Sequence, residues 1–497
     1  MSEEKKGEQT TGIETLAKQY VAWEPHEPFR KQVETALSAK DSALLVQMFG
    51  KRIAFGTAGL RAKMAGGYAY MNDLVIIQTS QGLCKYVDKH ITNGKKKGVI
   101  IGYDGRHNSK RFAEIAATVF KDYGFHIYFF NRYAATPLVP VGILQLKCAC
   151  GIVVTASHNP KDDNGFKVAK KQNKTNPKNC QSALRIHNIT KVYWENGAQI
   201  IPPHDEGIAA CIEENLKPWK HYEPFALDKD TDQKEIDITE RVGDAYFSEI
   251  ASRYCYHKDE NKDTKLKVTY TAMHGVGTHW ITKAYKAFDL PDFIPVKEQI
   301  DPDPDFSTVK FPNPEEGAGA LSLAIKTADA NDSPLIIGIF KKFFLYLLYA
   351  YIYLYNFFFV YYVNAGQKKI YKQTKKKKAN DPDADRLAIA EKMKNKKEWK
   401  IFNGNEIAIL LSDWAFVNYM KRHPKADVSK LVMIASTVSS KYLQSYATKN
   451  GFHFEDTLTG FKWMGNKAVD MIHDGYVFLF AFEVEIGFLI GDLSFDK

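Results

Sequence analysis

The stretch "GVIIGYDGRHNSKRFAEIAATVFKDYGFHIYFF", residues 98–130, predicts a strand, a helix and a second strand in that order. Residues 98–106 form an apolar, β-rich run that ends near Asp and Gly, residues 109–124 carry apolar positions at helical spacing, and residues 125–130 form a second apolar run. A third run, "GIVVTASHNP", starts at residue 151. Strands separated by helices of this length indicate a parallel sheet with βαβ crossovers, whose functional groups gather on loops at the carboxyl ends of the strands.

The same alternation of strand and helix signals continues along the chain. It appears in "KLKVTYTAMHGVGTHWITKAYKAF" (265–288), in the helical "EEGAGALSLAIKTADA" (315–330), in "PLIIG" (334–338), a strand that should lead straight into "NDPDADR" (380–386), and in "KLVMIASTVSSKYLQSYATKNG" (430–451). Residues 13–48 carry helical spacing alone. We therefore expect an α/β protein with a helical lead-in at 1–50 and three α/β domains at 51–215, 216–395 and 396–497.

Composition is that of an ordinary globular protein, because 45% of the 497 residues are hydrophobic and 25% are charged. The polar N-terminal segment has no apolar core of a secretory signal, so we expect a cytoplasmic protein with reduced cysteines. The net charge is +10, but nine lysines and no acid lie between Gly338 and Lys378. The rest of the chain is almost neutral, and we do not expect it to bind nucleic acid.

The loop "TASHNPKDDNGFKVAK" (155–170) directly follows an apolar strand. Ser157 is expected at the strand end beside His158 and the cation Lys167, which is an arrangement suited to a nucleophilic hydroxyl. A single Ser and His in a loop can equally be ordinary turn residues.

The segment "ANDPDADRLAIAE" (379–391) places carboxylates at every second residue, Asp381, Asp383 and Asp385. In an extended loop this period points them to one side, where hard oxygen ligands suit Mg²⁺. An acidic surface turn is the simpler alternative. An EF-hand loop is excluded, because its sixth position is Arg386 rather than Gly and its twelfth is a lysine rather than Glu.

Several motifs together carry a family resemblance. They are "GTAGLR" (56–61), "TASHNP" (155–160), "FPNPE" (311–315), "DPDADR" (381–386), "GNE" (404–406) and "TGFKW" (459–463). In this order they resemble the α-D-phosphohexomutase superfamily, and "ANDPDADRLA", "GNEIAILL" and "TGFKWMGNKA" resemble its eukaryotic phosphoglucomutase and phosphopentomutase branch. The resemblance implies α/β domains with mixed sheets.

The resemblance also implies a phosphorylated serine and a metal ion. Ser157 would carry the phosphoryl group, and its phosphate would complete the coordination of one Mg²⁺ per active site held by Asp381, Asp383 and Asp385. The metal would offset charge on the transferring phosphoryl group.

Other family positions match in this chain. Arg61 and Lys167 would lie beside the phosphoserine and help with proton transfer and charge, although neither is an obvious base at its ordinary pKa. His158 would act as a positioning group.

The family's substrate-binding positions match as well. They are Arg386 as a phosphate-binding cation, Gly460 and Lys462 in the ligand-recognition segment, and Glu483 in the sugar-binding loop. This loop reads "FEVEIGF" where the branch usually reads "FEEAIGF", so Val484 replaces a second acid.

The implied reaction moves a phosphoryl group between the 1 position and the 6 or 5 position of a hexose or pentose, through a sugar bisphosphate intermediate. A glucose-1,6-bisphosphate synthase, which uses the same phosphoserine with a separate donor, and a catalytically impaired paralogue stay open as alternatives. The sequence ends at "GDLSFDK", so we expect the family's fourth, phosphate-clamping domain to be absent and the third to be incomplete. The sequence predicts no oligomeric state.

Residues 343–363, from Phe343 to Val363, contain 12 aromatic side chains and one strongly polar residue, Asn356. The run is long enough for a bilayer, but aromatic residues form interfacial belts rather than fill a span. A span here would also interrupt the strand that leads to the acidic loop, so we do not expect membrane binding. From 339 to 378 the residues are almost all encoded by AT-rich codons, and we hypothesise a retained intron or gene-model error rather than a true insertion.

Overall fold

The computed structural model describes residues 3–57, 59–157, 159–167, 191–226, 236–256, 258–309, 321–339, 383–393 and 398–495. The side chains of residues 3–10 and of Phe166, Lys167, Lys191 and Ile339 lie outside this description. The chain forms two compact units, Met1–Thr239 and Glu240–Lys497. Each unit is described by itself.

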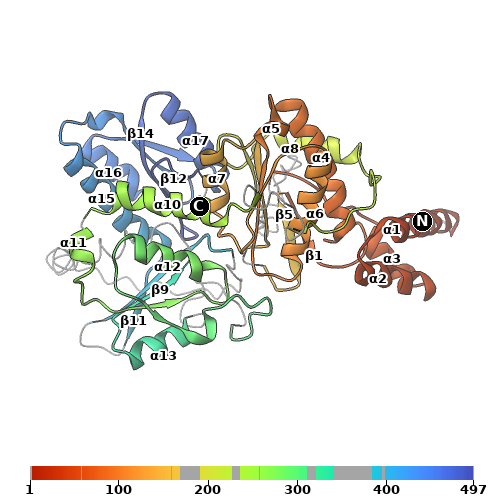
Figure 1. Ribbon diagram of the computed structural model, residues 1–497, viewed down its shortest axis with the longest axis horizontal. Coiled ribbons are helices and arrows are strands. Elements are labelled where there is room, and N and C mark those ends of the chain that lie inside the picture. Colours follow the sequence, from red (N-terminus) through yellow and green to blue (C-terminus); the bar gives the residue numbers. More distant parts are fainter. Residues whose placement is uncertain are drawn as a thin grey trace. The chain divides into compact units, whose positions relative to one another are not determined.

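Three helices open the first unit: α1 (Glu3–Trp23), α2 (Glu27–Ser38) and α3 (Ser42–Phe49), and they lie together near the N-terminus (Figure 1). A proline in the first turn starts α2, and the Asp41 side chain accepts a hydrogen bond from the Leu44 amide to start α3. The rings of Tyr20, Phe49 and Tyr68 meet edge to face in the core of this layer. This segment is therefore helical, as its spacing predicts.

The first unit contains a mixed sheet in the order β1-β5-β4-β2-β3, with β6 also paired to β4. The parallel order expected from the sequence holds for β3, β2 and β4, but β5 and β6 run antiparallel to β4, and β1 runs antiparallel to β5. The strands are β1 (Gly59–Lys63), β2 (Val99–Tyr103), β3 (Ile127–Phe129), β4 (Cys150–Val154), β5 (Asp163–Lys167) and β6 (Lys191–Trp194).

Helices cover this sheet and complete its core. They are α4 (Asp73–His90), α5 (Gly94–Lys97), α6 (Ser109–Asp122), α7 (Leu138–Leu146) and α8 (His204–Glu213). The Asn72 side chain caps α4 by accepting a hydrogen bond from the Val75 amide. Gly82 lets α8 approach α4 closely, because a Cβ atom there would lie 2.5 Å from the Ile212 side chain.

The described residues of the second unit form two sheets. The first has the order β11-β10-β9-β7-β8 and the second has the order β13-β12-β14-β15. Their strands are β7 (Val268–Thr271), β8 (Ile294–Pro295), β9 (Leu335–Ile339), β10 (Leu387–Lys392), β11 (Trp399–Ile401), β12 (Leu431–Ser436), β13 (His453–Thr457), β14 (Val477–Glu483) and β15 (Gly487–Ile490).

The strand expected at "PLIIG" is present as β9, and residues 340–382, which connect it to the described part of the acidic loop, lie outside the described residues. β9 ends at Ile339, and β10 returns antiparallel to it with Gly338 opposite Ala388 and Ile339 opposite Leu387. The described part of the acidic loop therefore directly precedes a strand that is paired with β9.

The helices described in the second unit are α10 (Thr239–Tyr254), whose first residue ends the first unit, α11 (Lys258–Asn261), α12 (Gly277–Ala287), α13 (Ser322–Ala330), α15 (Gly404–Arg422), α16 (Tyr442–Asn450) and α17 (Phe461–His473), with single 3₁₀ turns η2 (Lys297–Gln299) and η4 (Val428–Lys430). Helices α12 and α13 lie on opposite sides of the sheet that contains β9 (Figure 1). A reciprocal capping box between Asn403 and Glu406 fixes the start of α15.

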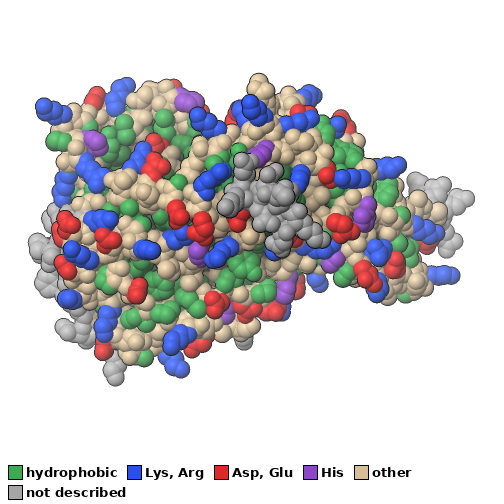
Figure 2. All heavy atoms as spheres, in the orientation of Figure 1, with side chains coloured by type: hydrophobic (Ala, Val, Ile, Leu, Met, Phe, Trp, Pro, Cys, Tyr) green, Lys and Arg blue, Asp and Glu red, His purple; other side chains and the backbone are tan. Residues whose placement is uncertain are grey.

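Positive and negative side chains are interspersed on the face seen in Figure 2, without a continuous basic surface there. In the part of the chain that the structure describes, no helix is both long and apolar enough to cross a membrane. The aromatic run 343–363 falls outside the described residues.

Candidate active site

Ser157 lies in the turn that joins β4 to β5, at the carboxyl end of β4. It is fully buried and has a left-handed backbone conformation with a φ of 48°. Such a conformation in a non-glycine residue costs on the order of 1–3 kcal/mol and persists only where the surroundings hold it. The backbone of Ser157 is therefore under strain at the position expected for the nucleophile.

Arg61 is brought to the same loop by strand pairing. β1 runs antiparallel to β5, with Arg61 opposite Gly165 and Gly59 opposite Lys167. The Arg61 guanidinium donates a hydrogen bond to the carbonyl oxygen of Ala156, the residue before Ser157. The backbone of Lys167 thus lies in this ladder, whereas its side chain and the whole of His158 fall outside the described residues.

Asp104 and Arg106, in "YDGR" at the end of β2, also contact this loop. They were not predicted as site residues from the sequence. They form an ion pair in which neither side chain is exposed, with 3.3 Å between Arg106 Nε and Asp104 Oδ2. Burial raises the pKa of the Asp104 carboxyl, while Arg106, Ser109 and Thr155 oppose the rise by favouring the carboxylate. The signal that could have found them is a charged pair placed between an apolar strand and a helix.

The described part of the acidic loop, Asp383 to Arg386, directly precedes β10. Asp383 and Asp385 are fully buried and Arg386 is nearly so. The extended geometry expected here is wrong at Ala384, which is left-handed with a φ of 58°, so a two-residue period alone does not point both carboxylates to one side.

The buried carboxylates of Asp383 and Asp385, which are separated by one residue, are hard oxygen donors of the kind that suits Mg²⁺. Within the described residues no group of three acidic, histidine or cysteine side chains is arranged around one point. The third expected ligand, Asp381, lies outside them. The donors that the structure describes fit a hard divalent cation in their chemistry.

Glu483 ends β14 and is buried, opposite Gly487 of β15. The turn between them approaches the N-terminus of α15, where a Cβ atom on Gly404 would lie 2.1 Å from the Val484 carbonyl oxygen. Glycine is therefore required in "GNE" for this approach. The same turn reaches the acidic loop, because the Leu387 amide donates a hydrogen bond of 3.2 Å to the Ile486 carbonyl oxygen. The second unit thus brings the acidic loop, "GNE" and the Glu483 turn together.

Gly460 and Lys462 follow β13. Gly460 has a φ of 112° and precedes the first residue of α17. Strands β13, β12 and β14 are parallel, with Thr457 opposite Ser436 and Phe482 opposite Ala435. The carboxyl ends of the three strands therefore meet at one edge, which places Gly460 and the first turn of α17, with Lys462, on the same edge as Glu483, with β12 between them.

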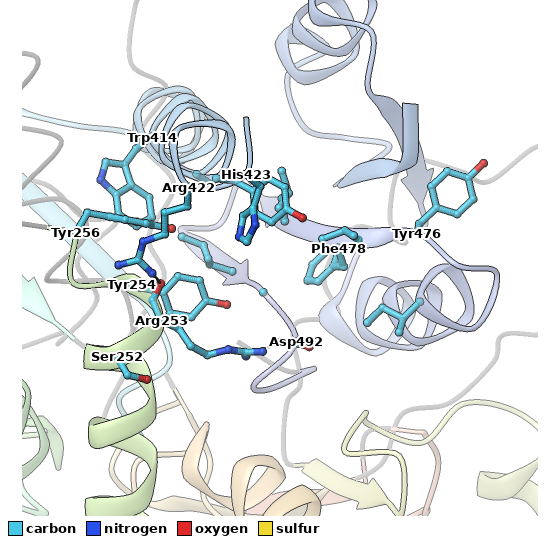
Figure 3. Close-up of a pocket in the computed structure, with 17 residues that line it drawn as sticks. Ser252, Arg253, Tyr254, Tyr256, Trp414, Arg422, His423, Tyr476, Phe478 and Asp492 are labelled. Carbon is cyan, nitrogen blue, oxygen red and sulfur yellow. Dashed lines mark hydrogen bonds and ion pairs between the residues drawn. The ribbon is translucent and has the colours of Figure 1, made fainter. Parts of the chain in front are cut away.

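A separate pocket of about 440 Å³ lies in the second unit. Its lining includes Tyr254, Trp414, Arg422, His423 and Phe478, and Figure 3 shows these side chains around the hollow. The Arg422 guanidinium lies 4.1 Å from the centre of the Tyr256 ring, which also lines it. None of the predicted site residues that the structure describes is among its lining residues.

Comparison with known proteins identifies the family. Models of the phosphoglucomutase/phosphomannomutase family match at residues 52–189 for α/β/α domain I, 244–340 for domain II and 403–497 for domain III. The chain belongs to this family, within the α-D-phosphohexomutase superfamily that its motifs indicate.

Curated relatives extend the match over nearly the whole chain. The chain is 40% identical over 489 residues to a phosphopentomutase of Homo sapiens, covering 96% of this chain and 68% of the human protein. It is 37% identical over 492 residues to a glucose 1,6-bisphosphate synthase of Homo sapiens, covering 98% of this chain and 68% of that protein. A probable phosphoribomutase of Schizosaccharomyces pombe is 36% identical over 493 residues, covering 98% and 70%.

Solved structures share the fold. A putative phosphomannomutase from Thermus thermophilus matches with a TM-score of 0.60 at 17% identity, over 90% of this chain and 77% of the other. The open form of parafusin, a phosphoglucomutase from Paramecium, matches with a TM-score of 0.53 at 15% identity, over 88% and 68%. The expected family and its α/β domains with mixed sheets are confirmed.

Proposed function

We propose that the protein is a phosphosugar mutase that moves a phosphoryl group between the 1 position and the 5 or 6 position of a pentose or hexose. The observation that carries this proposal is the buried, left-handed Ser157 at the carboxyl end of β4, within a family domain I. The similarity to a phosphopentomutase and a probable phosphoribomutase supports pentose phosphates as the first substrates to test.

In the proposed reaction, the Ser157 hydroxyl oxygen bears the phosphoryl group. The free hydroxyl of a sugar monophosphate attacks the phosphorus, the bond to Ser157 Oγ breaks, and the sugar leaves this step as a bisphosphate. The other phosphate of the bisphosphate then returns to Ser157. Arg61 and Lys167 would balance charge and assist proton transfer at Ser157, and His158 would position the loop.

The acidic loop would hold a magnesium ion through Asp381, Asp383 and Asp385. Bound Mg²⁺ would supply positive charge against the negative charge of the transferring phosphoryl group. Arg386 adds a fixed cation next to these carboxylates, which suits a phosphate oxygen.

Sugar recognition would rest on the loops at the strand ends of the last sheet. Glu483 would accept hydrogen bonds from sugar hydroxyls, and Gly460 and Lys462 would contact the ligand from the start of α17. The common edge of the sheet and the contact between Leu387 and Ile486 support this assignment, because they bring sugar-binding and metal-binding segments together.

The test is conversion of ribose 1-phosphate to ribose 5-phosphate by the purified protein with Mg²⁺ and a trace of sugar bisphosphate. Wild type is expected to interconvert the isomers, and Ser157→Ala is expected to be inactive. Equal rates for the two proteins would contradict the proposal.

A glucose-1,6-bisphosphate synthase is the second candidate, because a protein with that name is 37% identical to this chain. The same assay separates the two functions when a separate phosphoryl donor is added to it. A mutase keeps the amount of sugar bisphosphate constant while isomers interconvert, whereas a synthase with a separate phosphoryl donor accumulates it.

A further inference from the structure

Asp104 and Arg106 lie one strand away from Ser157. β2 and β4 are parallel neighbours with Tyr103 opposite Val154, and the Asp104 amide donates a hydrogen bond of 3.1 Å to the Val154 carbonyl oxygen. The two chains therefore leave the sheet side by side, and the buried ion pair stands next to the serine loop.

Arg106 contacts the inner side of this loop through its backbone carbonyls. Its Nη2 atom lies 2.5 Å from the oxygen of Ser157 and 2.7 Å from that of Asn159, and its Nη1 atom lies 2.8 Å from the oxygen of Pro160 and 3.3 Å from that of Asp163. The guanidinium is planar and rigid, so four carbonyl oxygens that converge on it are fixed relative to one another. One side chain thus sets the course of the loop from Ser157 to the start of β5.

Asp104 reaches the other side of Ser157 through Thr155. The Thr155 hydroxyl donates to Asp104 Oδ2 at 2.7 Å and accepts a hydrogen bond of 2.8 Å from the Ser157 amide. Asp104 Oδ1 accepts from the Ser109 hydroxyl at 2.6 Å and from the Arg106 amide at 3.1 Å. The amide and the carbonyl of Ser157 are therefore both tied to one ion pair, which is what a left-handed non-glycine residue requires to stay in that conformation.

We propose that Asp104 and Arg106 are positioning residues for the phosphoryl-accepting serine. They hold the Ser157 backbone in its left-handed conformation and so fix where the hydroxyl stands, without touching the sugar. The inference rests on the proposed mutase function. Small misplacements of a reacting group cost up to about a hundredfold in rate, so the pair acts on phosphoryl transfer and not on substrate affinity.

The same unit offers a matched control, the pair of Asp73 and Arg111. Asp73 is also fully buried, and Arg111 binds it through Nε at 2.8 Å and Nη2 at 2.7 Å. Asp73 begins α4, and Arg111 lies on α6. An effect that comes only from weakening a buried ion pair should therefore appear in both Arg106→Lys and Arg111→Lys.

The experiment compares these two variants in the full chain. Arg106→Lys keeps the charge, but a lysine cannot bind four carbonyl oxygens at once. Its kcat should fall at least tenfold, while its KM stays within about threefold of wild type. Arg111→Lys should stay within about twofold of wild type in both kcat and KM. Amide hydrogen exchange at residues 155–163 should be at least tenfold faster in Arg106→Lys than in Arg111→Lys. Thr155→Val removes the hydroxyl that connects Asp104 to the Ser157 amide and leaves Arg106 in place. It should lower kcat in the same direction, and it covers the case in which Arg106→Lys does not fold.

Each outcome bears on a different claim. If wild type accepts phosphate on Ser157 and Arg106→Lys matches Arg111→Lys in kcat and exchange, the inference is overturned while the proposed function stands. If wild type accepts no phosphate on Ser157, the proposed function and the catalytic part of the inference both fail. A rise in KM at constant kcat would place the pair in substrate binding and overturn the inference.

Discussion

Replacing Asp104 by asparagine removes one charge from a buried ion pair while keeping the shape of the side chain. The carboxylate accepts three hydrogen bonds, from the Arg106 amide and the Ser109 hydroxyl on Oδ1 and from the Thr155 hydroxyl on Oδ2. Its Oδ2 atom also lies 3.3 Å from Nε of the Arg106 guanidinium, as an ion pair. Hydroxyls can rotate to accept from an amide group, but N–H groups cannot. In either orientation the new NH₂ group faces one N–H of Arg106.

The magnitude follows from these contacts. A buried charge that loses its partner costs about 3–5 kcal/mol of unfolding free energy. In Asp104→Asn the new NH₂ group also faces an N–H group of Arg106, so the cost stays close to this range. The guanidinium of Arg106 keeps its hydrogen bonds to four carbonyl oxygens in the variant, so we expect a loss of unfolding free energy at the lower end, about 3 kcal/mol. For a unit of this size that corresponds to a fall in Tm of roughly 6–12 °C.

Scanning calorimetry of Asp104→Asn and Asp73→Asn tests this reasoning. The second variant leaves Arg111, whose side chain is 28% exposed and can be hydrated, so its loss should be about 1–2 kcal/mol. Equal losses in the two variants, or a loss below about 1 kcal/mol for Asp104→Asn, would show that the carboxylate is not the main partner of Arg106.

Three further predictions concern other parts of the chain. Burial and the charge of Asp73 raise the pKa of Glu24 to about 8. The folded protein is therefore most stable below the ordinary pKa of a glutamate, and it loses free energy of unfolding as the pH rises toward 8, at about 1.4 kcal/mol per unit of pKa shift. In denaturant unfolding, the free energy of unfolding of Glu24→Gln relative to wild type should increase by several kcal/mol between pH 5 and pH 8.5, and a constant difference would contradict this. Gly404→Ala should lower the free energy of unfolding by about 1–3 kcal/mol and raise the KM for the sugar phosphate, because the new methyl group displaces the Val484 carbonyl. Gly12→Ala is the control, because a methyl group there meets open space, and it should leave KM unchanged. Equal KM values in the two variants would count against a role of this contact. Deletion of residues 340–378 should keep the pairing of Ile339 with Leu387 and leave Tm unchanged or higher, and loss of exchange protection in β9 and β10 would contradict this.

The alternation of strands and helices is visible in the sequence because it depends on local periodicity. β2, α6 and β3 follow the apolar spacing of residues 98–130, and Ser157 stands at a strand end as its motif predicts. The acidic loop also stands at a strand boundary. These features are encoded by residues that are close together in the chain.

Features that depend on distant pairing were not predictable in this way. The antiparallel return of β10 along β9 and the pairing of β1 with β5 join segments whose own patterns do not specify a partner. Arg106 contacts backbone carbonyls about fifty positions later, and carbonyls leave no trace in side-chain spacing. The left-handed Ala384 is likewise set by its surroundings, since alanine has no preference for that conformation.

In the proposed reaction, Ser157 carries the phosphoryl group during transfer. The most direct measurement is mass spectrometry of the peptide that contains Ser157, after incubation of the full chain with Mg²⁺ and glucose 1,6-bisphosphate. One added phosphate is expected on Ser157; it should be lost again when excess sugar monophosphate is supplied, and it should never appear in Ser157→Ala. A folded protein that stays unphosphorylated at Ser157, or that carries the phosphate on another residue, would contradict the claim.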